Sequence, residues 1–252
     1  MKNNKQRIFI TGDKHGNFDF LTEFCHDNKT TVNDILIILG DTGLNYYVSN
    51  FSLETNDKIQ YQNLEWAKNV KKNLSQLPIT LFCIHGNHEA RPETVNGYEL
   101  SQFQGGNVYI ESAFPNLIFA IDGECYTFCN KKMIVIGGAY SVDKFYRIQK
   151  GLNWFKDEQP SNEIKQQVIN KLNENKWHVD FVLSHTVPFK FIPREMFLST
   201  INQTLVDNTT ELFLDEIEDK LSYEKWFCGH YHTNKKDSKI QLLFDEIQEI
   251  SE

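Results

Sequence analysis

The chain has 252 residues, of which 40% are hydrophobic, enough to build one sizeable core, so we predict a single domain over residues 1–252. Its formal net charge of -8 argues against bulk attraction to long nucleic acid or to an anionic membrane. No apolar run approaches the roughly 20 residues that span a bilayer, and no signal-peptide pattern follows the polar start, so we expect a cytoplasmic protein without a membrane partner.

Three short apolar runs in the first third of the chain each end at a glycine turn. Residues 7–11 and 34–39 lead into Gly-Asp, and residues 79–84 lead into His-Gly-Asn-His. Between the second and third runs, residues 57–77 carry apolar side chains at roughly helical spacing, and Pro78 closes that segment. This succession predicts a strand, a helix and a strand, and therefore an α/β fold with a partly parallel sheet.

After residue 107 the pattern changes to short β-rich runs separated by turn residues, at 108–110, 117–121, 124–129 and 133–136. We expect these runs to form a second, mixed or antiparallel sheet. Residues 163–176 and 210–221 are expected helices, whereas 179–183 and 225–228 are expected strands. Residues 239–247 are expected to form a last strand.

Metal-ligating side chains follow these strands, each beside a glycine or another small turn residue. The motifs are Gly12-Asp13-Lys14-His15-Gly16, Gly40-Asp41, Gly86-Asn87-His88-Glu89, Ser184-His185 and Gly229-His230-Tyr231-His232. Open α/β sheets place their sites at the carboxyl ends of strands, and glycine allows tight turns and close approach there. Carboxylate, imidazole and amide donors together suit manganese, iron, zinc or nickel better than magnesium held by oxygen alone. The set therefore predicts one binuclear metal site.

These motifs, in this order over residues 12–232, resemble those of the calcineurin-like metallophosphoesterases. The resemblance implies a four-layer αββα sandwich and two divalent ions, with manganese as our first choice. It also implies that Asp13, His15 and His232 hold one ion, that Asn87, His185 and His230 hold the other, and that Asp41 bridges them. A hydroxide between the ions would attack the phosphate, while His88 would stabilise the transition state or protonate the leaving oxygen.

The substrate class is a weaker inference than the family. Phosphoprotein phosphatases of this family carry Gly-Asp-x-Val-Asp-Arg-Gly, whereas residues 40–45 here read Gly-Asp-Thr-Gly-Leu-Asn and lack that arginine. The His230/His232 pair resembles the phosphodiesterase branches. We therefore expect a phosphodiester substrate, with a nucleotide-derived one as a candidate. A phosphomonoesterase is the alternative, and a nuclease on long nucleic acid or a non-catalytic binding scaffold is less favoured. No oligomeric state is predicted.

Several residues outside the motifs are candidates for contacts with the substrate. Within residues 137–154, Tyr140, Tyr146 and Trp154 could stack on a nucleobase or pack beneath a loop, and Arg147 or Arg91 could replace the missing arginine. Residues 186–207 follow His185 directly and could form a rim, a lid or an oligomer contact. Lys14 is expected to point into solvent, with a phosphate contact as the alternative.

Overall fold

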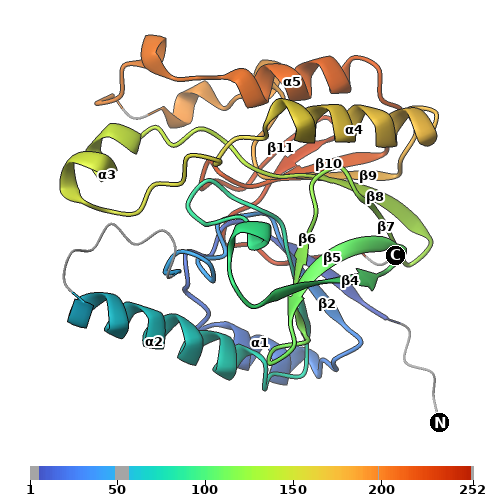
Figure 1. The fold of residues 1–252 in the computed structure, drawn as a ribbon. Helices are drawn as coiled ribbons and strands as arrows, with labels where there is room; N and C mark the ends of the chain where they lie inside the picture. Colours follow the sequence, from blue (N-terminus) through green and yellow to red (C-terminus); the bar gives the residue numbers. More distant parts are fainter. Residues whose placement is uncertain (1–5, 49–56, 198, 251–252) are drawn as a thin grey trace.

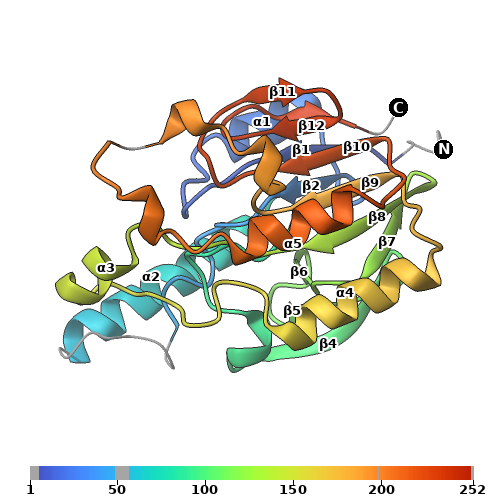
Figure 2. The ribbon, with the colours of Figure 1, turned by 90° about the horizontal axis from the view of Figure 1, so that it is seen from above.

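The computed structural model describes residues 6–48, 57–197 and 199–250. Two β-sheets pack face to face, and helices cover their outer faces, so the layers run helix, sheet, sheet, helix (Figures 1 and 2). This arrangement confirms the predicted αββα sandwich. Within the described residues, no helix combines the length and the apolar character needed to cross a membrane.

The first sheet has seven strands in the order β13-β1-β2-β3-β6-β5-β4. The strands β1, β2, β3 and β6 are parallel neighbours, while the pairs at either edge are antiparallel. Helices α1 (Leu21–Asn28) and α2 (Asp57–Leu74) connect the first three strands. The strand bounds are β1 Ile8–Thr11, β2 Ile35–Ile38, β3 Thr80–Cys83, β4 Tyr98–Phe103, β5 Gly106–Glu111, β6 Leu117–Ala120 and β13 Gln248–Glu249.

The second sheet has six strands in the order β11-β12-β10-β9-β8-β7. Here β8, β9, β10 and β12 are parallel neighbours. Helices α4 (Asn162–Glu174) and α5 (Thr209–Glu218) pack on its outer face, and α3 (Lys144–Lys150) lies to one side (Figure 1). The strand bounds are β7 Cys125–Phe128, β8 Lys131–Ile136, β9 Phe181–Ser184, β10 Lys225–Cys228, β11 Lys235–Asp237 and β12 Ile240–Leu242.

The central strands are buried on both faces, which explains their continuous apolar runs. In β1, Ile8 and Ile10 face the second sheet, while Phe9 between them packs against the side of α1. In β10, Phe227 faces the first sheet, and Trp226 packs toward α4 and α5. Side chains on a strand alternate between faces, so one short run supplies both the core between the sheets and the core beneath the helices.

The expected boundary between the sheets at residue 107 is wrong. Strands β5 and β6 join the first sheet, because β6 pairs in parallel with β3, with Leu81 opposite Leu117. The second sheet begins only at β7. Within the expected last strand, 239–247, only Ile240–Leu242 forms a strand, β12, and the next strand, β13, begins after that span and joins the other sheet. Strand order is set by long-range pairing, which short runs of β-forming residues do not encode.

Candidate metal centre

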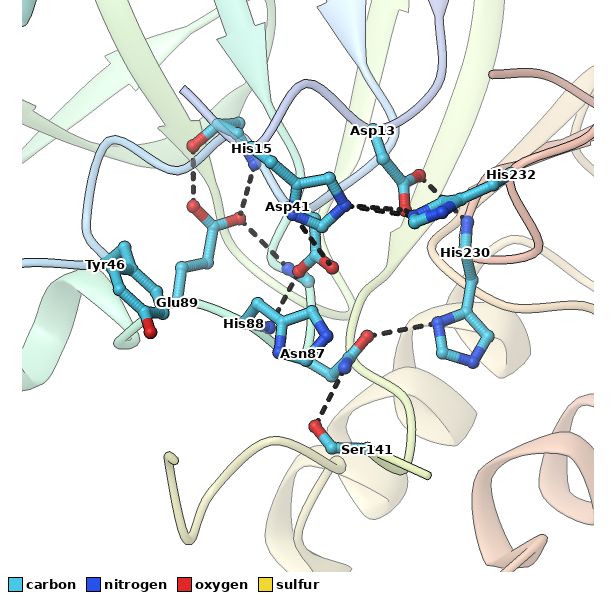
Figure 3. Close-up of polar contacts among 12 residues, drawn as sticks. Asp13, His15, Asp41, Tyr46, Asn87, His88, Glu89, Ser141, His230 and His232 are labelled. Carbon is cyan, nitrogen blue, oxygen red and sulfur yellow. Dashed lines mark hydrogen bonds and ion pairs between the residues drawn. The ribbon is translucent and has the colours of Figure 1, made fainter. Parts of the chain in front are cut away.

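The predicted ligands converge because their strands end side by side. Asp13 follows β1, Asp41 follows β2 and Asn87 follows β3, all in the first sheet. His185 follows β9, and His230 and His232 follow β10, both in the second sheet. The two packed sheets therefore deliver side chains to one place from both sides, as Figure 3 shows.

Four of these residues hold backbone conformations that are rare for residues other than glycine. His15, Asp41, His230 and His232 have φ angles of 48°, 47°, 69° and 48°. The left-handed region costs free energy for a residue with a Cβ, and such conformations cluster at functional sites, where the surrounding structure holds them. The strands thus end in tight turns that aim each side chain across the sheet edge.

Glycine allows the loops of this site to approach one another. Gly40 has a φ of 92°, and a Cβ there would lie 2.2 Å from Nδ1 of His185. A Cβ on Gly86 would lie 2.1 Å from the backbone nitrogen of Asp41. Any larger residue at either position would separate the strands' ends and with them the candidate ligands.

One cluster joins Asp13, His15 and His232. Oδ2 of Asp13 lies 3.3 Å from Nε2 of His232 and 3.9 Å from Nε2 of His15, and the two Nε2 atoms are 3.0 Å apart. Asp13 Oδ2 is buried, and it has no hydrogen-bond partner among the described residues. A buried carboxylate oxygen facing two imidazole nitrogens fits a divalent cation better than it fits a purely structural role.

A second cluster surrounds the amide oxygen of Asn87. Oδ1 of Asn87 lies 2.8 Å from Nε2 of His185 and 3.0 Å from Nδ1 of His230. Asp41 lies between the clusters, since its Oδ2 is 3.9 Å from Nδ1 of His15 and 3.8 Å from Nε2 of His185. A single ion could also contact ligand atoms from Asp13, Asp41 and His185, which lie close to one another.

Neighbouring groups fix how two of these side chains point. Nδ1 of His185 lies 2.7 Å from the carbonyl oxygen of Leu39, and because a carbonyl can only accept, Nδ1 carries the proton. In the neutral ring Nε2 then presents a lone pair, as a metal ligand requires. The Nδ2 group of Asn87 donates to Oγ of Ser141 at 2.8 Å, which directs the amide oxygen toward His185 and His230. The sequence carries no signal that distinguishes Ser141 from other loop serines.

The charges of the site also fit bound cations. Burial raises the pKa of the Asp41 carboxyl well above its usual value, and the nearby Asp13 raises it further. Burial, followed by the charge of His185, lowers the pKa of His230 to about 3. The site therefore contains two buried carboxyl groups that repel each other and a ring in the neutral, metal-binding form. Divalent ions would relieve that repulsion.

Glu89 supports the loops without entering either cluster. Its Oε1 accepts from the backbone N–H of Thr42 at 3.3 Å and of Gly86 at 3.1 Å, and its Oε2 accepts from Oγ1 of Thr42 at 2.5 Å. Burial, and then the charge of Asp41, raise the pKa of Glu89 to about 7. The carboxyl group ties the turn after β2 to the turn after β3, and it holds Asp41 and Asn87 in register.

Two hollows open beside the clusters, and His88 lines both. The first has a volume of 570 Å³ and is lined by His15, Gly43, Tyr46, Tyr47, Asn63, Trp66, His88 and Arg147. The second has a volume of 360 Å³, and its apolar wall includes Val142, Ile192, Met196, Phe197 and Tyr231. The segment after His185, expected to form a rim, a lid or an oligomer contact, supplies much of this second wall.

One prediction about the surroundings is wrong, and one of the two candidate arginines lies away from both hollows. Lys14 is buried, and its Nζ donates to the carbonyl oxygen of Phe244 at 2.8 Å, so it does not point into solvent. Arg91 is buried in an ion pair with Asp122 at 2.7 Å and lines neither hollow. Of the two candidate arginines, only Arg147 lines a hollow.

The three aromatic residues considered either for stacking on a base or for packing beneath a loop differ in where they lie. Tyr140 lines the second hollow, but Tyr146 and Trp154 line neither. Nζ of Lys144 lies 4.1 Å from the centroid of the Trp154 ring, and the Trp154 indole N–H donates to Oε2 of Glu158 at 2.7 Å. The aromatic side chains that line the first hollow are instead Tyr46, Tyr47 and Trp66, and these were not identified from the sequence. The two tyrosines follow the Gly40-Asp41 turn closely, which was an available signal.

Comparison with known protein families assigns this chain to one of them. The family model described as calcineurin-like phosphoesterase matches residues 6–234. One solved crystal structure is 14% identical, with 94% of this chain and 89% of that chain covered and a TM-score of 0.48. The crystal structure of TT1561 of Thermus thermophilus is 11% identical, with 95% and 88% covered and a TM-score of 0.43. No curated protein sequence matches significantly. Because the family model spans most of the chain, this protein belongs to the calcineurin-like phosphoesterases, a family of metal-dependent phosphoester hydrolases with a binuclear centre.

Proposed function

We propose that this protein hydrolyses a phosphodiester, with a nucleotide-derived diester as the favoured class. The observation that carries the proposal is the pair of hollows that meet at His88 beside the two ligand clusters. A diester carries two organic groups on its phosphorus, whereas a monoester carries one. A phosphorus held at the clusters would have one hollow for each substituent. The single buried cluster shared by both sheets supports one domain as the unit of activity.

Two divalent ions would complete this site. Asp13, His15 and His232 would hold one ion, Asn87, His185 and His230 would hold the other, and Asp41 would contact both. The mixture of oxygen and nitrogen donors supports manganese, with iron, zinc or nickel as alternatives. When bound, such ions supply Lewis-acid chemistry, since they lower the pKa of a shared water and draw charge from phosphoryl oxygens.

His88 would act on the substrate rather than on the ions. Its backbone N–H donates to Oδ1 of Asp41 at 2.7 Å, which fixes the residue beside the clusters. Its ring borders both hollows, so the ring would lie against the phosphate between the two substituents. This position suits a hydrogen bond to a phosphoryl oxygen in the transition state.

The proposal is tested by turnover of bis-p-nitrophenyl phosphate and p-nitrophenyl phosphate by metal-stripped protein, with manganese, nickel, zinc or magnesium added singly. We expect metal-dependent release of p-nitrophenol from the diester, fastest with manganese, and slower turnover of the monoester. Cyclic nucleotides, dinucleotides and long DNA would then refine the substrate class. Turnover of the monoester alone would instead identify the protein as a phosphomonoesterase.

Replacing Ser141 with alanine is expected to weaken one metal site selectively. The variant removes the acceptor that turns the Asn87 amide, and loss of such an outer contact typically costs roughly 10- to 100-fold in metal affinity. Competition with a chromogenic chelator would measure both sites. Ser75→Ala, just past the end of α2 at a hydroxyl that donates to the carbonyl oxygen of Lys72, is the control. Equal affinity in the two variants would show that Ser141 does not position Asn87.

A further inference from the structure

Three aromatic side chains form one continuous wall of the first hollow. The rings of Tyr46 and Tyr47 meet edge to face at a centroid distance of 4.8 Å, and those of Tyr47 and Trp66 do the same at 5.7 Å. Figure 3 draws Tyr46 on the opposite side of the cluster from His230. The aromatic wall therefore lies on the same side of the site as His15.

Trp66 packs against the loop that carries His15, although the tryptophan is substantially exposed. It lies on α2 and keeps 45% of its surface accessible. A Cβ on Gly16, the residue after His15, would lie only 2.9 Å from the Cη2 atom of this indole. The ring thus reaches from the helix to the site, and it keeps more accessible surface than a buried structural tryptophan would.

Arg147 supplies the polar side of the same hollow. Its Nη1 donates to the hydroxyl of Tyr46 at 3.2 Å, and its Nε donates to Oδ2 of Asp143 at 2.7 Å. These bonds hold the guanidinium in place, and among the described residues that line the hollow it is the one Lys or Arg side chain. Asn63 adds an amide with both a donor and an acceptor.

We propose that the first hollow binds a planar aromatic heterocycle of the substrate, with the chemistry of a nucleobase, and so deepens the function proposed above, on which it rests. The rings of Tyr47 and Trp66 offer apolar contact and stacking to the base. Arg147 and Asn63 offer hydrogen bonds to its edge or to an adjoining phosphate oxygen. The volume of 570 Å³ lies within the usual range for small-molecule sites, about 300–1,000 Å³. The second hollow, whose apolar wall mixes aliphatic and aromatic side chains, would take the other substituent.

The test compares two ligands that share a sugar phosphate and differ in the base. Calorimetric titration of manganese-loaded protein with adenosine 5′-monophosphate and with ribose 5-phosphate gives both dissociation constants. For Trp66→Ala we expect the dissociation constant of the nucleotide to rise at least about fivefold, the lower end for loss of one stacking ring. The constant for ribose 5-phosphate should stay unchanged, and Trp66→Phe should restore nucleotide binding.

Tyr61→Ala is the matched control, because Tyr61 is another exposed aromatic residue of α2 and does not line the hollow. Nucleotide affinity unchanged in Trp66→Ala, or reduced equally for both ligands, would overturn the inference. Turnover of bis-p-nitrophenyl phosphate by the same preparations separates the two proposals. If wild-type protein cleaves that diester but does not prefer the nucleotide to ribose 5-phosphate, the base site is wrong and the diesterase remains. If it does not cleave the diester, the proposed function itself fails.

Discussion

Replacing Asp41 with asparagine is expected to abolish retention of both metal ions and to lower turnover at least about a thousandfold. Lewis-acid stabilisation by bound ions is worth several kcal/mol, and each 1.36 kcal/mol changes a rate tenfold. Asparagine keeps an oxygen that can accept from the backbone N–H of His88, so the loop should keep its shape. The change therefore removes the negative charge between the two clusters and little else.

Metal content per chain and thermal unfolding together would measure this effect. Asp13 and Asp41 repel each other when no cation is present, so the metal-free variant should be at least as stable as metal-free wild type. Added manganese should raise the melting temperature of wild type but not that of the variant, because only a ligand that binds the folded state stabilises it. Asp27→Asn, at an exposed carboxylate of α1, is the control. Two retained ions with wild-type turnover would contradict the bridging position of Asp41.

The candidate ligands could be found from the sequence because they stand in ordered local motifs at the ends of strands. A short buried strand precedes each of Asp13, Asp41, Asn87, His185 and His230. Such strands can be recognised in the sequence as unbroken apolar runs. Parallel strands share the direction of their carboxyl ends, so motif and topology together bring the side chains close. The strands that carry the candidate ligands, and the place where these side chains meet, thus both followed from short-range patterns, whereas β4 and β11 were not expected.

The surroundings of the site were less predictable because they depend on contacts between distant segments. Nothing in the helical pattern of α2 indicates that the ring of Trp66 reaches Gly16. Lys14 lies between two candidate ligands, yet its amine donates to Phe244 near the other end of the chain. The partner of Asn87, Ser141, also comes from a loop in the other half of the fold. Tertiary packing decides such contacts, and one sequence does not encode them locally.

Replacing His88 with alanine is expected to leave both ions bound and to lower kcat roughly 10²- to 10³-fold, the usual cost of losing one hydrogen-bond donor to a transition state. The bond that ties this residue to Asp41 comes from the backbone, so it survives the substitution. No hydrogen bond of the His88 ring is recorded among the described residues, so the change should leave the fold intact. Metal content equal to that of wild type would separate this variant from Asp41→Asn, and His26→Ala, at a ring on the surface, is the control.

The structure also favours one of the two roles considered for His88. Burial, and then the charge of Arg147, lower the pKa of the ring to about 2, so the imidazole is neutral near pH 7. A neutral imidazole can donate a hydrogen bond to a phosphoryl oxygen, but it has no acidic proton to give a leaving group. The loss in His88→Ala should therefore be the same across aryl methyl phosphates whose leaving phenols differ in basicity. A loss that grows with the basicity of the phenol would instead identify His88 as the proton donor.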